Sequence, residues 1–230
     1  MAREALCRML ATGELSPGQR LPGEIELCNR FGLSRSSLRE AQKMLVAVGV
    51  LDSQAGGRLT VSDMSAAKLM TGLAMVVPLL PLERLLEMFP LRQILEGHAT
   101  AQATSRMTDA ELEGLVALAA QVAELTAEDP RFEELDQEFH LRIIRAADDP
   151  MIQALLETIH HRGADYHVLA HGDLKRTSDA AHARIADAMY RREPMLARAL
   201  MIQHIQDSYE WLSNLQPAPR PEASADEQRA

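Results

Sequence analysis

Aromatic residues are scarce in this chain of 230 residues, which holds only one Trp, three Tyr and four Phe. Leu, Ala, Met and Val must therefore supply most of the core packing. Two cysteines exclude the disulfide framework that stabilises small secreted domains. The most apolar stretch, residues 73–82, contains two prolines and is shorter than the ~20 residues of a membrane-spanning helix. The first ten residues lack the apolar core of a signal peptide, so we expect a cytoplasmic protein that does not bind membranes.

The overall composition is that of an ordinary globular protein, with 47% hydrophobic and 25% charged residues. The formal net charge of −9 argues against nucleic-acid binding, but this charge is unevenly spread. Residues 1–62 hold eight of the 24 basic residues and only six of the 33 acidic ones. Such asymmetry indicates two functions on one chain, and the length allows two small domains.

Residues 1–63 show the pattern of three short helices followed by a β-hairpin. Ser34 is a favourable N-cap, because its hydroxyl accepts from free N–H groups in the first turn of a helix. The elements expected from periodicity and turn residues are helices before Gly13, over 24–31 and over about 35–48, and strands over 50–53 and 59–61 around Gly56 and Gly57. This order predicts a winged helix-turn-helix domain.

The third predicted helix presents candidate DNA contacts on the face opposite its apolar stripe. Arg35 and Arg39 are one turn apart, and arginine can contact guanine O6 and N7 bidentately in the major groove. Ser36, Ser37 and the free N–H groups of the helix start suit phosphate contacts, and Arg58 follows the hairpin turn. For an isolated helix, a solvated polar face would be the simpler interpretation. The ordered turn, capped helix and hairpin favour DNA binding instead.

The stretch from Pro17 to Val61 closely resembles the DNA-binding domain of the GntR family of bacterial regulators. The matching residues are Pro17, Gly18, Leu21, Pro22, Glu24, Leu27, Gly32 to Arg35, Leu38 to Ala41, Leu45 and Gly49, followed by the Gly-rich wing. The resemblance implies that Arg35, Ser36, Ser37 and Arg39 read the operator and that Gly56 lies at the wing tip. Ile25 departs from the polar or basic residue that some relatives carry near the start of the second helix.

The rest of the chain is expected to be helical throughout. Helix starts are marked by a capping box at Thr108 and Glu111 and by Pro at 130, 150 and 194. The pattern predicts helices over about 66–77, 83–104, 109–127, 130–146, 150–171, 177–192 and 194–214. We therefore expect a mainly α protein: a linker and connecting helix over 64–82, an all-α antiparallel helical bundle over 83–214 and a disordered tail over 215–230.

Four residues on apolar helix faces are candidate metal ligands. Asp136 and His140 are one turn apart on a face that Phe139 and two isoleucines flank, while His182 and His204 also lie on apolar stripes. Buried imidazoles and carboxylates need partners, and one divalent metal would satisfy all four. The N and O donors suit Zn²⁺, with Ni²⁺, Mn²⁺ or Fe²⁺ as alternatives. Hydrogen-bonded core histidines are the other interpretation, and His167 with His171, near His160 and His161, forms a competing pair.

This second part resembles the all-helical FCD effector domain of FadR-like GntR regulators. The resemblance rests on LRQILEGHATAQAT near residue 91, on DQEFHLRIIRAADDP near residue 136 and on the surroundings of His182 and His204. It implies that Asp136, His140, His182 and His204 bind the metal. It also implies that Arg92 faces the cavity, where it would pair with an effector carboxylate.

The sequence therefore predicts a transcriptional regulator, which we expect to be a homodimeric repressor. Its two recognition helices would address half-sites of a palindromic operator in double-stranded DNA. A small organic or sugar acid would bind near the metal and release the DNA. The alternative is a metal-dependent hydrolytic enzyme that uses the His/Asp site, but no general base is evident and the DNA-binding segment would be unexplained. A purely structural metal is compatible with the regulator.

Overall fold

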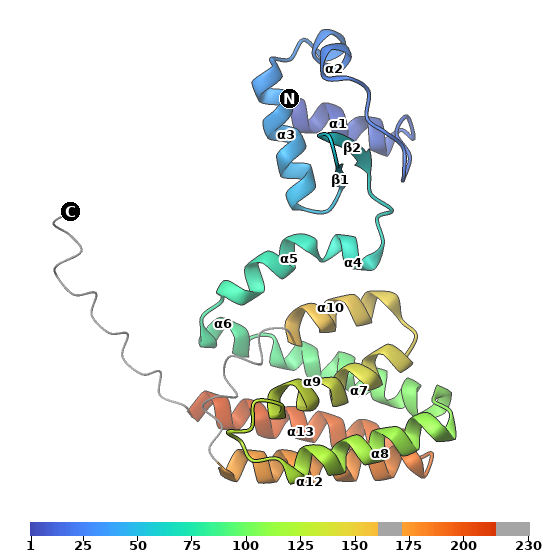
Figure 1. Ribbon diagram of the computed structural model, residues 1–230, viewed down its shortest axis with the longest axis vertical. Helices are drawn as coiled ribbons and strands as arrows, with labels where there is room; N and C mark the ends of the chain where they lie inside the picture. Colours follow the sequence, from blue (N-terminus) through green and yellow to red (C-terminus); the bar gives the residue numbers. More distant parts are fainter. Residues whose placement is uncertain (161–171, 215–230) are drawn as a thin grey trace, which may run out of the picture. The chain divides into compact units, whose positions relative to one another are not determined.

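The computed structural model of this protein describes residues 1–160 and 172–214, and the chain divides into two compact units. The first unit holds residues 1–79 and 148–160, and the second holds residues 80–147 and 172–214. The expected fold class is confirmed, because a winged helix-turn-helix and an all-α bundle are both present (Figure 1). The predicted tail over 215–230 lies outside the described residues.

The first unit begins with the predicted three helices and hairpin. They are α1 (Ala2–Ala11), α2 (Glu24–Phe31), α3 (Arg35–Ala47), β1 (Leu51–Gln54) and β2 (Arg58–Val61). The strands pair antiparallel, with Leu51 opposite Val61 and Gln54 opposite Arg58. Gly56 and Gly57 close this turn with φ of 82° and 73°, which L side chains rarely adopt. Leu6, Leu27, Leu38, Leu51 and Val61 pack together as the core of this domain.

Four further segments lie in the first unit. The expected helix over 66–77 is instead interrupted, as α4 (Ala66–Leu69), α5 (Thr71–Val76) and a 3₁₀ turn over Val77–Leu79. Pro78 lacks an N–H group and so cannot continue the α-helical bonding of α5. The helix α10 (Pro150–His160) packs against α4 and α5. The remainder of the predicted helix over 150–171 lies outside the described residues.

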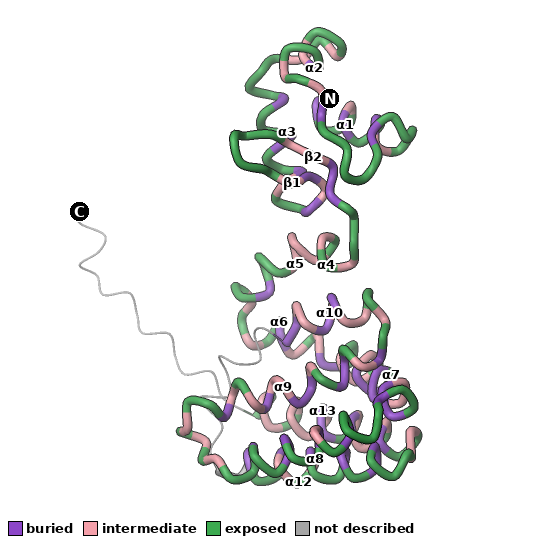
Figure 2. The backbone as a smooth tube through the Cα atoms, turned by 45° about the vertical axis from the view of Figure 1, so that its right-hand side comes forward, coloured by how far each residue is buried: buried purple, intermediate pink, exposed green. Residues whose placement is uncertain are grey.

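The second unit is a bundle of helices. Its members are α6 (Leu82–Leu86), α7 (Phe89–Arg106), α8 (Asp109–Glu124), α9 (Phe132–Ala146), α12 (Gly172–Tyr190) and α13 (Pro194–Asn214). The helix α7 packs against α9 and α13, while α12 lies between α8 and α13. Buried positions recur along these helices between exposed ones (Figure 2). They form one apolar core that draws on α7, α8, α9, α12 and α13.

Three of the four marked helix starts are present, whereas α9 begins at Phe132, two residues after the predicted start at Pro130. The capping box at Thr108 and Glu111 is present, and the Asp149 carboxylate accepts from two backbone N–H groups of α10 at 3.1 Å. The predicted helix over 83–104 is broken before Phe89, because Pro90 is tolerated in a first turn but not in a helix interior. Among the described helices, none is both long enough and apolar enough to cross a membrane.

Candidate DNA-reading surface and metal centre

The start of α3 is fixed by its own side chains. The Ser34 hydroxyl accepts from the Ser37 backbone N–H at 3.1 Å and lies 3.2 Å from the Ser36 hydroxyl. Leu38 is fully buried, and Ala41 and Leu45 follow it on the same face. This apolar stripe anchors α3, so the opposite side of the helix faces solvent.

The candidate base contacts lie on that exposed side. Arg35, Ser36, Ser37 and Arg39 are all exposed. The Arg39 guanidinium is paired with Glu24 at the start of α2, with its Nε 3.0 Å from Glu24 Oε1. This pairing lowers the pKa of Glu24 and raises that of Arg39. Two arginines and two hydroxyls are thus presented together at the N-terminal half of one helix.

The wing supplies the remaining DNA-contact candidates. Gly56 lies in the exposed turn between β1 and β2, and Arg58 is the exposed first residue of β2. Gly56 has no heavy atom within 4 Å of the position that a Cβ would occupy. The turn tip is therefore open, with a cation at its base, which suits contact with a phosphate backbone.

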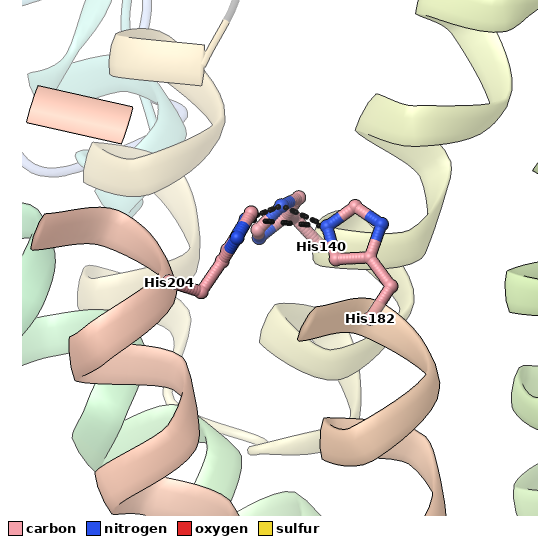
Figure 3. Close-up of side chains that lie close together, drawn as sticks. All are labelled: His140, His182 and His204. Carbon is pink, nitrogen blue, oxygen red and sulfur yellow. Dashed lines mark hydrogen bonds between the residues drawn. The ribbon is translucent and has the colours of Figure 1, made fainter. Parts of the chain in front are cut away.

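Three histidines from three helices converge in the second unit (Figure 3). His140 lies on α9, His182 on α12 and His204 on α13, and all three are buried. Their Nε2 atoms lie 3.2 Å apart for His182 and His140, 3.2 Å for His182 and His204, and 3.3 Å for His204 and His140. The Phe139 ring stacks on His182 with ring centroids 4.3 Å apart. The three nitrogens are thus gathered at one point inside the bundle.

The donor set fits a divalent cation. Two nitrogens held roughly 2.0–2.1 Å from one ion at the tetrahedral angle lie about 3.3 Å apart, close to the three distances found. A neutral imidazole directs a single N–H or lone pair from Nε2 along one line. Three such nitrogens cannot satisfy three mutual contacts as hydrogen bonds, whereas one cation accepts all three lone pairs. His140, His182 and His204 together could hold a metal ion.

A carboxylate that the sequence analysis missed lies against this cluster. Glu96 of α7 is 1% exposed, and its Oε2 lies 3.0 Å from His140 Nδ1. Its other oxygen accepts from Arg92 Nε at 2.7 Å, and the Arg92 side chain is only 13% exposed. A carboxylate on the outer nitrogen of a ligating histidine fixes the ring and its tautomer. The i,i+4 spacing of Arg92 and Glu96 was the one available sequence signal.

The remaining predicted residues lie in different surroundings. Asp136 is buried, and its Oδ1 lies 3.7 Å from His182 Nδ1, the ring nitrogen outside the Nε2 cluster. It is not in the group of three whose ligand atoms lie within 4.8 Å of one another. Arg92 is engaged by Glu96. The competing His167 and His171, and also His161, lie outside the described residues.

The fold and site define a class: transcriptional regulators that join a DNA-binding winged helix to a helical effector domain. Residues 1–61 match the model of the bacterial regulatory proteins, gntR family, and residues 87–207 match that of the FCD domain. The chain therefore belongs to the FCD-containing, FadR-like branch of the GntR family. It is a transcriptional regulator and not an enzyme, so the hydrolase alternative is set aside.

Individual relatives support this assignment. The chain is 26% identical over 215 residues to the Glc operon transcriptional activator of Escherichia coli (strain K12), covering 88% of this chain and 84% of that protein. It is 27% identical over 214 residues to the transcriptional repressor NanR of Cronobacter sakazakii, covering 89% and 81%. Among solved structures, Streptococcus agalactiae GntR matches with a TM-score of 0.56 and 26% identity, covering 91% of this chain and 98% of that one.

Proposed function

We propose that this regulator is a repressor whose affinity for an operator is controlled by a small carboxylic or sugar acid bound near a divalent metal. The observation that carries the proposal is the convergence of three buried Nε2 atoms beside the Glu96–Arg92 pair. The proposed domains are residues 1–63 for DNA binding, 64–82 as linker and 83–214 for effector binding and dimerisation.

At the DNA end, Arg35 and Arg39 read base edges in the major groove, while Ser36 and Ser37 contact phosphates. Gly56 and Arg58 bring the wing to the DNA backbone. The exposure of all six residues supports this assignment. A homodimer presents two such surfaces to a palindromic operator in double-stranded DNA, with half-sites about one helical turn apart.

At the effector end, His140, His182 and His204 hold the metal. Asp136, buried one turn before His140 on α9, is the proposed fourth ligand, for which its carboxylate would turn from His182 Nδ1 towards the ion. Zn²⁺ is the proposed ion, with Ni²⁺, Mn²⁺ and Fe²⁺ as alternatives for this donor set. The metal supplies a positive charge that attracts a carboxylate. Arg92 provides a second cation, and an arriving effector carboxylate shares it with Glu96.

The effector relieves repression if it binds more tightly to a conformation of the chain that does not fit the operator. One relative is named as an activator and another as a repressor, so the direction is decided by experiment. The protein is proposed to act in the cytoplasm, where its DNA would be found.

The experiment begins by selecting an operator from a random-sequence duplex library with the full-length protein. Operator affinity is then measured by fluorescence anisotropy against a panel of hydroxy, keto and sugar acids, with Zn²⁺-loaded and chelator-treated protein. We expect one acid to weaken operator binding by about 5- to 150-fold, the usual range of allosteric coupling. Chelation and His204→Ala should abolish this response.

The matched control is His98→Ala, because His98 is exposed on α7 and lies outside the cluster. It should respond to the acid as the wild type does. A response that persists in chelated protein and in His204→Ala would show that the metal does not anchor the effector. If the acid instead tightens operator binding, the acid acts as a co-repressor, and the proposed relief of repression is wrong.

A further inference from the structure

The ion pair between α2 and α3 has a specific geometry. Arg39 Nε donates to Glu24 Oε1 at 3.0 Å and lies 3.2 Å from Oε2, while Arg39 Nη2 donates to Oε2 at 3.0 Å. The carboxylate therefore occupies the edge of the guanidinium that Nε and Nη2 form. The pair joins the first residue of α2 to the second turn of α3.

The edge that Glu24 leaves open is the one suited to guanine. A guanidinium has five N–H groups in one plane, and its terminal fork is formed by Nη1 and Nη2. Among the described residues, the hydrogen bonds of Arg39 involve Nε and Nη2, and none involves Nη1. The Arg39 side chain is 62% exposed. The Nη1/Nη2 edge is thus the one that Glu24 does not occupy, and an edge of this kind can contact guanine O6 and N7 bidentately.

Stability does not account for this pair. Both side chains are substantially exposed, at 62% for Arg39 and 36% for Glu24, and exposed ion pairs contribute little because water and salt screen them. A carboxylate beside a DNA-binding arginine also repels phosphates, so it opposes non-specific binding. What the pair does fix is the position of the Arg39 guanidinium against the start of α2.

We propose that Glu24 is a positioning residue for specific readout, which aims the Nη1/Nη2 fork of Arg39 at one base pair. This inference rests on the proposed role of Arg39 in reading the operator. A free arginine loses rotamer freedom on binding DNA, and a side chain already held in place loses less. Glu24 also keeps the guanidinium from turning to a phosphate. It thereby raises the affinity for the operator relative to unrelated DNA.

The test compares wild type with Glu24→Gln, Arg39→Ala and the double variant, all as full-length protein. The matched control is Glu26→Gln, which removes the same charge from an exposed position on α2 that is not a partner of Arg39. Thermal unfolding checks that each variant is folded. Affinities are measured for an operator selected from a random duplex library, for its single-base-pair variants and for an unrelated duplex.

We expect Glu24→Gln to lower the ratio of operator to unrelated-DNA affinity by about two- to tenfold, the range expected from ordering one side chain. The loss should fall at the base pair where Arg39→Ala also loses discrimination, and the affinity for unrelated DNA should rise. Glu26→Gln should leave the ratio unchanged. In the Arg39→Ala background, Glu24→Gln should cause no further loss of discrimination.

The positioning role would be overturned if Glu24→Gln left the ratio of operator to unrelated-DNA affinity unchanged. It would also be overturned if Glu24→Gln lowered this ratio equally in the wild-type and Arg39→Ala backgrounds. Either result would leave DNA readout by Arg39 intact. If Arg39→Ala keeps full discrimination, the proposed role of Arg39 fails, and the inference fails with it. The same conclusion follows if the wild type selects no sequence.

Discussion

Replacement of Glu96 by Gln tests whether the buried carboxylate orients a metal ligand. Glu96 is 1% exposed and is bonded to both His140 Nδ1 and Arg92 Nε. The amide keeps the shape but replaces one of the two acceptor oxygens by an N–H₂ donor, so one partner faces a donor instead of an acceptor. Losing the outer partner of a ligating histidine lowers metal affinity by about 10- to 100-fold, which is about 1.4–2.7 kcal/mol.

The same substitution should also destabilise the metal-free protein. Breaking a buried ion pair costs about 3–5 kcal/mol, but the amide oxygen still accepts one hydrogen bond and Arg92 retains 13% exposure. We therefore expect a loss of about 1–3 kcal/mol. Zn²⁺ affinity is measured by competition with a chromophoric chelator, and stability by urea unfolding of chelated protein. Glu113→Gln is the control, because Glu113 is exposed on α8. Wild-type Zn²⁺ affinity in Glu96→Gln would refute the orienting role.

Three further predictions concern the wing, a glycine and an aspartate in the turn before α9. Arg58→Ala should weaken binding to all duplexes alike. The slope of log affinity against log salt concentration should fall by about 1, because one phosphate contact is lost. An unchanged slope would place Arg58 away from the DNA backbone. Gly49 has φ of +77°, and an added Cβ would meet a backbone carbonyl oxygen of α4, so Gly49→Ala should destabilise the protein by about 2 kcal/mol or more. Urea unfolding checks this, with Gly23→Ala as the unstrained control. Hydrogen bonds from Arg131 lower the pKa of Asp129 from 3.8 to about 2, so its stabilisation is complete above pH 3.8 and is lost as the pH falls towards 2. Asp129→Asn should flatten acid unfolding in that range, and an unaltered acid profile would contradict this.

Local sequence was sufficient for the elements of the DNA-binding domain. The Ser34 cap, the apolar stripe through Leu38 and the glycine pair of the wing each act over a few residues. These features depend on hydrogen bonds and backbone conformations within one turn, and residues that are neighbours in the sequence determine both. Two breaks within predicted helices were missed, one at Met70 in the helix over 66–77 and one before Phe89 in the helix over 83–104. The second was missed because the periodic pattern continues across Pro90.

The site was only partly determined by sequence. Periodicity placed His140, His182 and His204 on inward faces, but the 3.2–3.3 Å distances between their nitrogens depend on how three helices pack. Glu96 was missed because nothing in the pattern of α7 distinguishes a buried carboxylate from a solvated one. The Glu24–Arg39 pair likewise joins residues 15 positions apart. Sequence by itself determined which faces turn inward, since that depends on local hydrophobicity. Only the tertiary structure decided which polar atoms meet, because burial forces them to find partners across helices.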